Sequence, residues 1–125
     1  MRLLIDSNAF IWMVSQPREL SASSRLALVD PANERFLSIA SIWEIAIKLS
    51  GGKLEFPGTL QAAVDGMAAE MLPITMVHIG RTQALPFHHR DPFDRMMIAQ
   101  AMEEGLTIVT RDRVFQSYGV PVLPA

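Results

Sequence analysis

The sequence predicts an α/β fold with a mostly parallel central sheet of four to five short strands and helices on both faces. Two observations predict it. Short apolar runs alternate along the chain with longer segments of helical character, and connections of that length are typical of parallel strands. The run LLI is apolar at every position and LTIV at every position but Thr107, as expected of strands that are buried on both sides.

The elements follow one another without a repeat or a linker, so we expect a single domain covering residues 1–125. The predicted strands cover residues 2–5, 35–39, 71–74, 106–109 and 120–123. The last of them should be an edge strand, because Pro121 has no backbone N–H to donate. The predicted helices cover residues 7–15, 21–30, 40–50, 58–70, 76–85, 92–104 and a short final segment ending at Tyr118.

Capping residues and helix breakers set the boundaries of the first three helices. Ser7 or Asn8 is the expected cap of the first helix, which Pro17 stops. Ser21 is the expected cap of the second helix. The third helix, ASIWEIAIKLS, closes at Gly51. It is apolar at nearly every position, so we expect it to be largely buried.

The later helices are bounded in the same way. Gly66 interrupts the fourth helix at a cost of about 1 kcal/mol, and Thr75 caps the fifth. Asp91 and Pro92 open the clearest helix, since aspartate is a good cap and proline suits the first helical position. Gly105 lies just beyond its end.

The composition excludes several classes of function. Eleven Lys and Arg against thirteen Asp and Glu give a net charge of −2, so binding of a polyanion must be local or assisted by a metal ion. The absence of cysteine excludes disulfides, zinc–thiolate sites and cysteine nucleophiles. No run is long enough to span a membrane and no signal peptide is recognisable, which predicts a cytoplasmic protein.

Two acidic residues fall where a parallel sheet binds ligands, and a third lies on the inward face of a helix. Asp6 and Asp112 follow predicted strands, and ligands bind at the carboxyl ends of such strands. An aspartate there can equally cap the next helix. Asp94 lies on the apolar face of its helix, and an inward carboxylate must be paired, protonated or bound to a metal. Glu44, by contrast, is spaced for a simple ion pair with Lys48.

The histidines do not form a ligand set. His88 and His89 are adjacent, and neither they nor His78 have a second histidine at helical spacing. We therefore interpret all three as surface or loop residues.

Convergence of the acidic residues would select a hard cation. Carboxylates that crowd together repel one another, and oxygen ligands without His or Cys favour Mg²⁺ or Mn²⁺. Such an ion can activate a water for attack on a phosphodiester. Flanking phosphates could then be held by basic side chains, and the candidates are Lys48, Arg90, Arg95, Arg111 and Arg113.

Four segments together resemble a known family. LLIDSN, SIASIWEIAIKLSGGKLEFP, LPFHHRDPFDRMMIAQAMEEGLTIVTRD and FQSYGV occur in the order found in PIN-domain ribonuclease toxins of the VapC type, and they cover almost the whole chain. The resemblance implies that Asp6, Glu44, Asp94 and Asp112 are the catalytic and metal-binding acids. It implies supporting or capping roles for Ser7, Asn8, Asp91 and Thr110. Close relatives often read D-T-H at the first motif, where this chain has Asp6-Ser7-Asn8.

The resemblance also implies the function and partners of such toxins. These are endonucleolytic cleavage of RNA, usually tRNA or ribosomal RNA, with Mg²⁺ or Mn²⁺; a homodimer; and neutralisation by a cognate antitoxin. Two alternatives stay open. One is a phosphatase-like or phospho-acceptor domain, which also carries aspartates at strand ends. The other is a catalytically silent binding module of the same fold, for which the Asn8 departure is the only support.

Overall fold

Five parallel strands form one sheet in the order β3-β2-β1-β4-β5 in the computed structural model, which describes residues 1–125. The strands are β1 (Arg2–Ile5), β2 (Glu34–Ser38), β3 (Glu70–Leu72), β4 (Thr107–Thr110) and β5 (Val122–Pro124). The strand order reverses direction at β1, so the crevice between the ends of β1 and β4 is the switch point of the sheet. The predicted parallel α/β fold is confirmed.

Six α-helices and two short 3₁₀-helices connect the strands. They are α1 (Ser7–Ser15), η1 (Pro17–Glu19), α2 (Ala22–Val29), α3 (Ile39–Ser50), α4 (Leu60–Gly66), α5 (Met76–Ala84), α6 (Pro92–Glu104) and η2 (Arg113–Tyr118). None of these helices combines the length and the apolar content that crossing a membrane requires.

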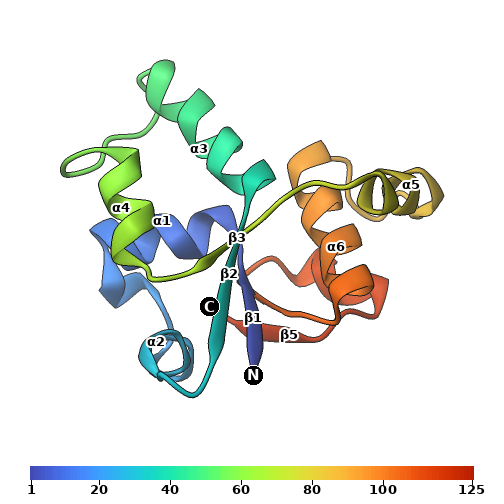
Figure 1. The fold of residues 1–125 in the computed structure, drawn as a ribbon, viewed down its shortest axis with the longest axis horizontal. Helices are drawn as coiled ribbons and strands as arrows, with labels where there is room; N and C mark the ends of the chain where they lie inside the picture. Colours follow the sequence, from blue (N-terminus) through green and yellow to red (C-terminus); the bar gives the residue numbers. More distant parts are fainter.

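The sheet separates two hydrophobic cores. Successive strand residues point to opposite faces, so Leu3 and Ile5 pack in one core and Leu4 in the other. The first core includes residues of α1 to α4, and the second includes residues of α6 and η2 together with Leu85, just after α5. Figure 1 shows these two groups of helices on opposite sides of the strands. α3 and α6 flank the place where β1 ends.

The structure corrects the boundaries of two predicted helices. α4 covers residues 60–66 and not 58–70, because Thr59 caps it and Glu70 already belongs to β3. The last helix is a 3₁₀-helix. The expected cap of α1 was also wrong. Asp6, and not Ser7 or Asn8, accepts a hydrogen bond from the backbone N–H of Ala9.

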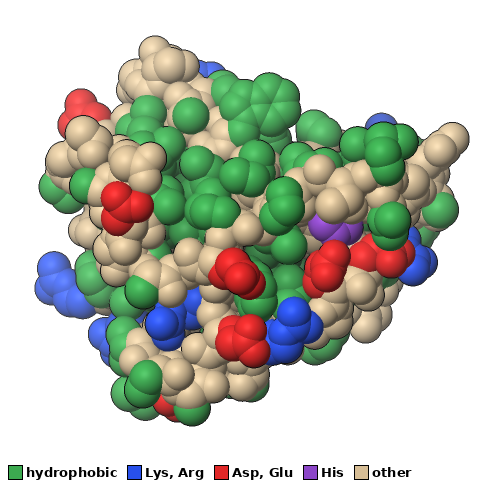
Figure 2. Space-filling model, in the orientation of Figure 1, with side chains coloured by type: hydrophobic (Ala, Val, Ile, Leu, Met, Phe, Trp, Pro, Cys, Tyr) green, Lys and Arg blue, Asp and Glu red, His purple; other side chains and the backbone are tan.

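The prediction that α3 is largely buried is wrong for its outer face. Ile39, Trp43 and Ile47 follow one another at helical spacing, and their exposed fractions are 43%, 61% and 47%. Figure 2 shows hydrophobic side chains gathered over α3 and between α3 and α4 on this side of the molecule. α3 therefore contributes an exposed apolar stripe as well as core residues.

Candidate active site

Four acidic side chains gather near the carboxyl ends of β1 and β4. Asp6 follows β1 directly, and Asp112 lies two residues beyond β4. Glu44 comes from the middle of α3 and Asp94 from the first turn of α6. Asp6 lies close enough to Glu44 and Asp112 for their charges to raise its pKa, and Asp94 is affected in the same way by Glu44 and Asp6. Elements far apart in sequence therefore meet at one acidic cluster, which we define as Asp6, Glu44, Asp94 and Asp112.

Asp6 is the most deeply placed member of the acidic cluster. It is 6% exposed, and its Oδ1 accepts a hydrogen bond of 2.7 Å from the backbone N–H of Ala9. Burial raises its pKa from 3.8 to about 6. Hydrogen bonds from Thr110 and Ala9 oppose that rise, and the charges of Glu44 and Asp112 add to it.

Glu44 does more than form the ion pair that its spacing predicts. Lys48 Nζ does lie 3.7 Å from its Oε2. However, the buried hydroxyl of Ser7 donates a hydrogen bond of 2.5 Å to its Oε1. This second contact crosses from α1 to α3 and turns the carboxylate toward the end of β1. The sequence pattern alone therefore described only one of its two contacts.

Asp94 is the inward-facing carboxylate that the pattern of α6 predicts. Its side chain is 23% exposed. Burial, followed by the neighbouring charge of Asp91, raises its pKa to about 7, although His89 opposes that rise. Mutual repulsion was expected to raise the pKa values in this cluster, and it contributes, but burial is the largest cause at both Asp6 and Asp94.

The interpretation of His89 as a simple loop residue was incomplete. Its Nε2 lies 2.9 Å from Oδ2 of Asp112 and 3.1 Å from Oδ2 of Asp94. The nitrogen and carboxylate oxygens of these three residues all lie within 4.8 Å of one another. One feature of the sequence could have indicated this contact: His89 lies two residues before the helix cap Asp91, at the edge of the sheet where the acids gather.

The interpretation of His78 as a surface residue was wrong. Its side chain is 1% exposed and lies between α5 and the end of α6. Its Nδ1 accepts a hydrogen bond from the backbone N–H of Thr75, and its Nε2 lies 2.9 Å from Glu104. His78 thus closes a capping box and does not belong to the acidic cluster.

The residues expected to support the acids divide into two groups. Asp91 accepts hydrogen bonds from the backbone N–H groups of Phe93 and Asp94, and so caps α6. Thr110 Oγ1 accepts a hydrogen bond of 3.1 Å from the backbone N–H of Asp112. Asn8, by contrast, is exposed and is not the helix cap.

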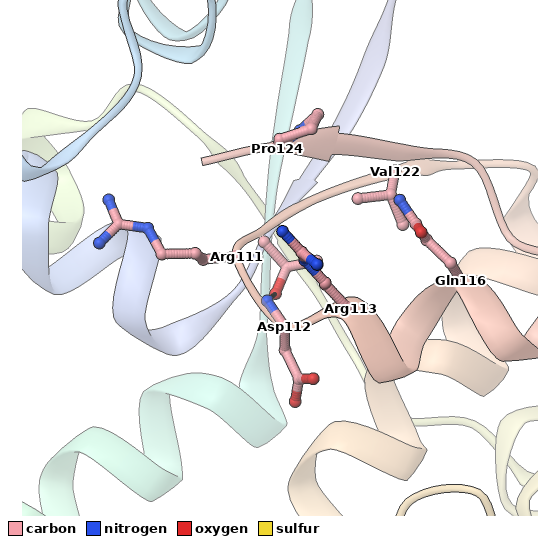
Figure 3. Close-up of a pocket in the computed structure, with 7 residues that line it drawn as sticks. Arg111, Asp112, Arg113, Gln116, Val122 and Pro124 are labelled. Carbon is pink, nitrogen blue, oxygen red and sulfur yellow. Dashed lines mark hydrogen bonds between the residues drawn. The ribbon is translucent and has the colours of Figure 1, made fainter.

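Two of the candidate phosphate ligands, Arg95 and Arg111, form hydrogen bonds with backbone carbonyls elsewhere. Arg95 is 8% exposed, and its guanidinium donates to four backbone carbonyls in the segment before α6. Arg111 donates to the backbone oxygens of Ala125 and Glu19 and stacks over Trp12. Figure 3 shows Arg111 directed toward α1, while Asp112 points toward the space between α3 and α6. The expectation for Arg95 and Arg111 is therefore corrected, and Lys48 stays at the edge of the acidic cluster.

The acidic cluster fits a hard divalent cation. Its donors are carboxylate oxygens, and two of its acids carry raised pKa values because burial leaves their charges poorly compensated. A positive charge placed among them would favour their ionised forms. Oxygen-rich sites of this kind suit Mg²⁺ or Mn²⁺ better than softer metals. A bound divalent cation also gives such a site the means to hold a phosphate group.

Comparisons with known proteins agree with this geometry. The family model described as PIN domain matches residues 3–121. The chain is 27% identical over 122 residues to Ribonuclease VapC22 of Mycobacterium tuberculosis (strain ATCC 25618 / H37Rv), covering 95% of this chain and 93% of that protein.

Solved structures with the same fold are chains of toxin–antitoxin complexes. One is VapBC2 from Rickettsia felis bound to a promoter DNA fragment, with a TM-score of 0.75, 15% identity and 98% of each chain covered. Another is DNA-bound VapBC from Salmonella typhimurium, with a TM-score of 0.72, 18% identity and coverage of 98% of this chain and 97% of that one. A third is a toxin–antitoxin complex from Klebsiella pneumoniae, with a TM-score of 0.67, 22% identity and coverage of 98% and 96%. At sequence identities of 15% to 22%, the similarity to these structures establishes a shared fold.

Proposed function

Because this chain belongs to the PIN-domain family, we propose that it is a metal-dependent endoribonuclease and the toxin of a toxin–antitoxin pair. The observation that carries the proposal is the meeting of Asp6, Glu44, Asp94 and Asp112 at the switch point of the sheet. The likeness to Ribonuclease VapC22 supports RNA as the substrate. tRNA and ribosomal RNA are the substrates that we expect.

Each residue of the acidic cluster has a proposed role. Asp6, Asp94 and Asp112 would hold Mg²⁺ or Mn²⁺, with Glu44 as a fourth carboxylate. When bound, such an ion lowers the pKa of a coordinated water and offsets the charge of the phosphodiester. Ser7 Oγ holds Glu44 in place, and a Thr110 hydrogen bond favours the ionised form of Asp6. Lys48, at the edge of the cluster, is the proposed contact to a substrate phosphate.

A hollow beside Asp112 gives the RNA strand a second basic contact. It has a volume of about 460 Å³ and is lined by Thr110, Arg111, Asp112, Arg113, Gln116, Val122 and Pro124. Arg113 is exposed and lies near the centre of this hollow (Figure 3). It replaces Arg95 and Arg111 as the proposed phosphate contact on this side.

RNA cleavage by the purified protein tests the proposed function. We expect cleavage of tRNA or ribosomal RNA with Mg²⁺ or Mn²⁺, none with EDTA, and loss of cleavage in Asp6→Asn. Wild-type rates in that variant would contradict the assignment of the site. No detectable Mn²⁺ binding at millimolar concentration would favour a silent binding module. A stable aspartyl-phosphate on Asp6 after incubation with a small phosphodonor would favour a phospho-acceptor domain.

We propose the exposed apolar stripe of α3 as a contact for the antitoxin. Ile39, Trp43 and Ile47 form this stripe, and Trp43 also packs edge-to-face on Phe93, with ring centroids 5.4 Å apart. Trp43 precedes Glu44 in the sequence and Phe93 precedes Asp94, so a partner that covers the stripe would lie next to the acidic cluster. Trp43→Asp should then weaken co-purification with the antitoxin without loss of fold. A homodimer and a cytoplasmic location complete this proposal.

A further inference from the structure

We propose that His89 acts as an internal substitute for the cation. Its Nε2–H donates to Asp112 and lies against Asp94, and an incoming ion has to displace it. This inference rests on the proposed function, since it concerns the same carboxylates. It assigns His89 as a positioning residue and as a competitor of the metal, and not as a ligand.

The first observation is the double contact of the ring with the two acids. Nε2 lies 2.9 Å from Oδ2 of Asp112 and 3.1 Å from Oδ2 of Asp94, both within hydrogen-bond range. The N–H donates its hydrogen bond to Asp112 and also lies close to Asp94, so it reduces the repulsion between the two carboxylates as a cation would. The charges of Asp91, Glu44 and Asp6 disfavour the ionised form of Asp94, whereas His89 favours it.

The second observation identifies which ring nitrogen carries the proton. The backbone N–H of Asp91 donates to Nδ1 of His89 over 3.2 Å, so Nδ1 is the acceptor. In the neutral ring the proton is then on Nε2, which makes Nε2 a donor. To bind a metal through Nε2, the ring would have to move this proton to Nδ1. The proton would then face the Asp91 N–H, and that hydrogen bond would be lost.

The third observation is the limited space between the two carboxylates. Oxygen ligands lie about 2.1 Å from Mg²⁺. One ligand atom from each of the three residues lies within 4.8 Å of the others, so an ion held by both Oδ2 atoms would lie close to Nε2. The hydrogen on Nε2 is directed at Asp112, so the N–H and an ion compete for the same carboxylate.

The backbone of His89 is fixed while its ring can move. The His89 N–H donates to the hydroxyl of Tyr118 over 2.7 Å, and its carbonyl accepts from Arg95. The ring is packed edge-to-face against Phe115 on one side, and the side chain is 17% exposed. Displacement thus needs a side-chain rotation and no movement of the loop.

Titration calorimetry with Mn²⁺ at one fixed pH tests this role without measuring RNA cleavage. The central variant is His89→Asn, whose side-chain oxygen can still accept from Asp91 but which is too short to bridge the carboxylates. We expect it to bind Mn²⁺ about tenfold more tightly than the wild type, since a hydrogen bond to a charged group no longer has to be broken. His89→Gln, with an amide donor near the position of Nε2, should stay close to the wild type. His88→Asn is the matched control and should not change the affinity.

Thermal unfolding provides the second measurement. Without metal, His89→Asn should have a lower midpoint than the wild type, and Mn²⁺ should raise that midpoint by more than it does in the wild type. Weaker Mn²⁺ binding in His89→Asn would make His89 a ligand and overturn the inference. An unchanged affinity would overturn it as well, and would leave the proposed ribonuclease intact. Absence of Mn²⁺ binding in the wild type would contradict both the proposed metal-dependent ribonuclease and the competition between His89 and the cation.

Discussion

Two histidines at opposite ends of α6 make almost the same contacts in very different surroundings. His78 and His89 each accept a backbone N–H at Nδ1, over 3.1 and 3.2 Å, and each places Nε2 2.9 Å from a carboxylate. His78 meets the carboxylate of Glu104, at the last residue of α6. His89 meets Asp112 and also Asp94, in the first turn.

The difference between the two sites is the number of acids. His78 is buried and satisfied by a single carboxylate that is itself 41% exposed, so water can solvate the charge of Glu104. His89 faces two carboxylates, and Asp6, Glu44 and Asp91 also act electrostatically on Asp94. The same local geometry therefore stabilises a helix junction at one end of α6. At the other end it leaves an excess of negative charge that a cation can use.

The largest expected difference between the two sites is in RNA cleavage. Asp112→Asn should lower the rate by about a hundredfold or more, because it removes a proposed metal ligand, and several kcal/mol of charge stabilisation can depend on such an ion. Glu104→Gln, the matched change beside His78, should leave the rate unchanged. Single-turnover cleavage with Mn²⁺ measures both. Comparable losses in the two variants would remove the distinction between the sites.

The second prediction concerns pH and the metal-free protein. Burial raises the pKa of Asp6 from 3.8 to about 6 and that of Asp94 to about 7. Between about pH 4 and 7 the folded state therefore holds protons that the unfolded state has released, so the free energy of unfolding falls as pH rises. For Asp6 alone the loss is about 3 kcal/mol at most.

Urea unfolding in EDTA at several pH values measures this dependence. Asp6→Asn should flatten the curve, because the amide cannot ionise. Added Mn²⁺ should flatten it in the wild type, since bound metal favours the ionised acids. A stability that rises from pH 5 to pH 7 without metal would contradict the charge excess in the acidic cluster.

The third prediction concerns the stability that His78 provides. His78→Ala should destabilise the protein by about 2 kcal/mol, because it leaves the Thr75 N–H without its acceptor and opens space in a buried contact. Thermal unfolding measures the loss. The affinity for Mn²⁺ should not change in this variant, in contrast to His89→Asn. A change in Mn²⁺ affinity would show that the two histidine sites are coupled.

The smallest expected effect lies in the hollow beside Asp112. Arg113→Gln should weaken RNA binding severalfold and lower its salt dependence by about one phosphate contact. The affinity for Mn²⁺ should stay nearly the same, because Arg113 forms no ion pair with the carboxylates of the acidic cluster. Fluorescence anisotropy with labelled RNA, in an Asp6→Asn background without cleavage, measures the change. An unaltered salt slope would exclude this contact.

Local sequence signals predicted most of the fold and three of the four acids, Asp6, Asp94 and Asp112. β1 and α1 occupy the predicted residues, and Asp91, Pro92 and Gly105 bound α6 as expected, because caps and breakers act over a few neighbouring residues. The hydrogen-bond partners of the side chains were harder to predict from the sequence. Arg95 follows Asp94 directly in sequence, yet its guanidinium turns to the carbonyls of residues 82–89, which no local pattern reveals.

By itself, the sequence determined the order of strands and helices and placed Asp6 and Asp112 just beyond two strands, since hydrophobic periodicity and capping are properties of short segments. The family resemblance, also carried by the sequence, singled out Glu44. Only the tertiary structure decided which groups share one small volume. In the folded protein His89 lies close to both Asp94 and Asp112, and Ser7 donates a hydrogen bond to Glu44. Arg111 points toward α1 and away from the acidic cluster. These contacts join residues separated by many positions, and their energy depends on distance and burial, which packing of the whole chain fixes.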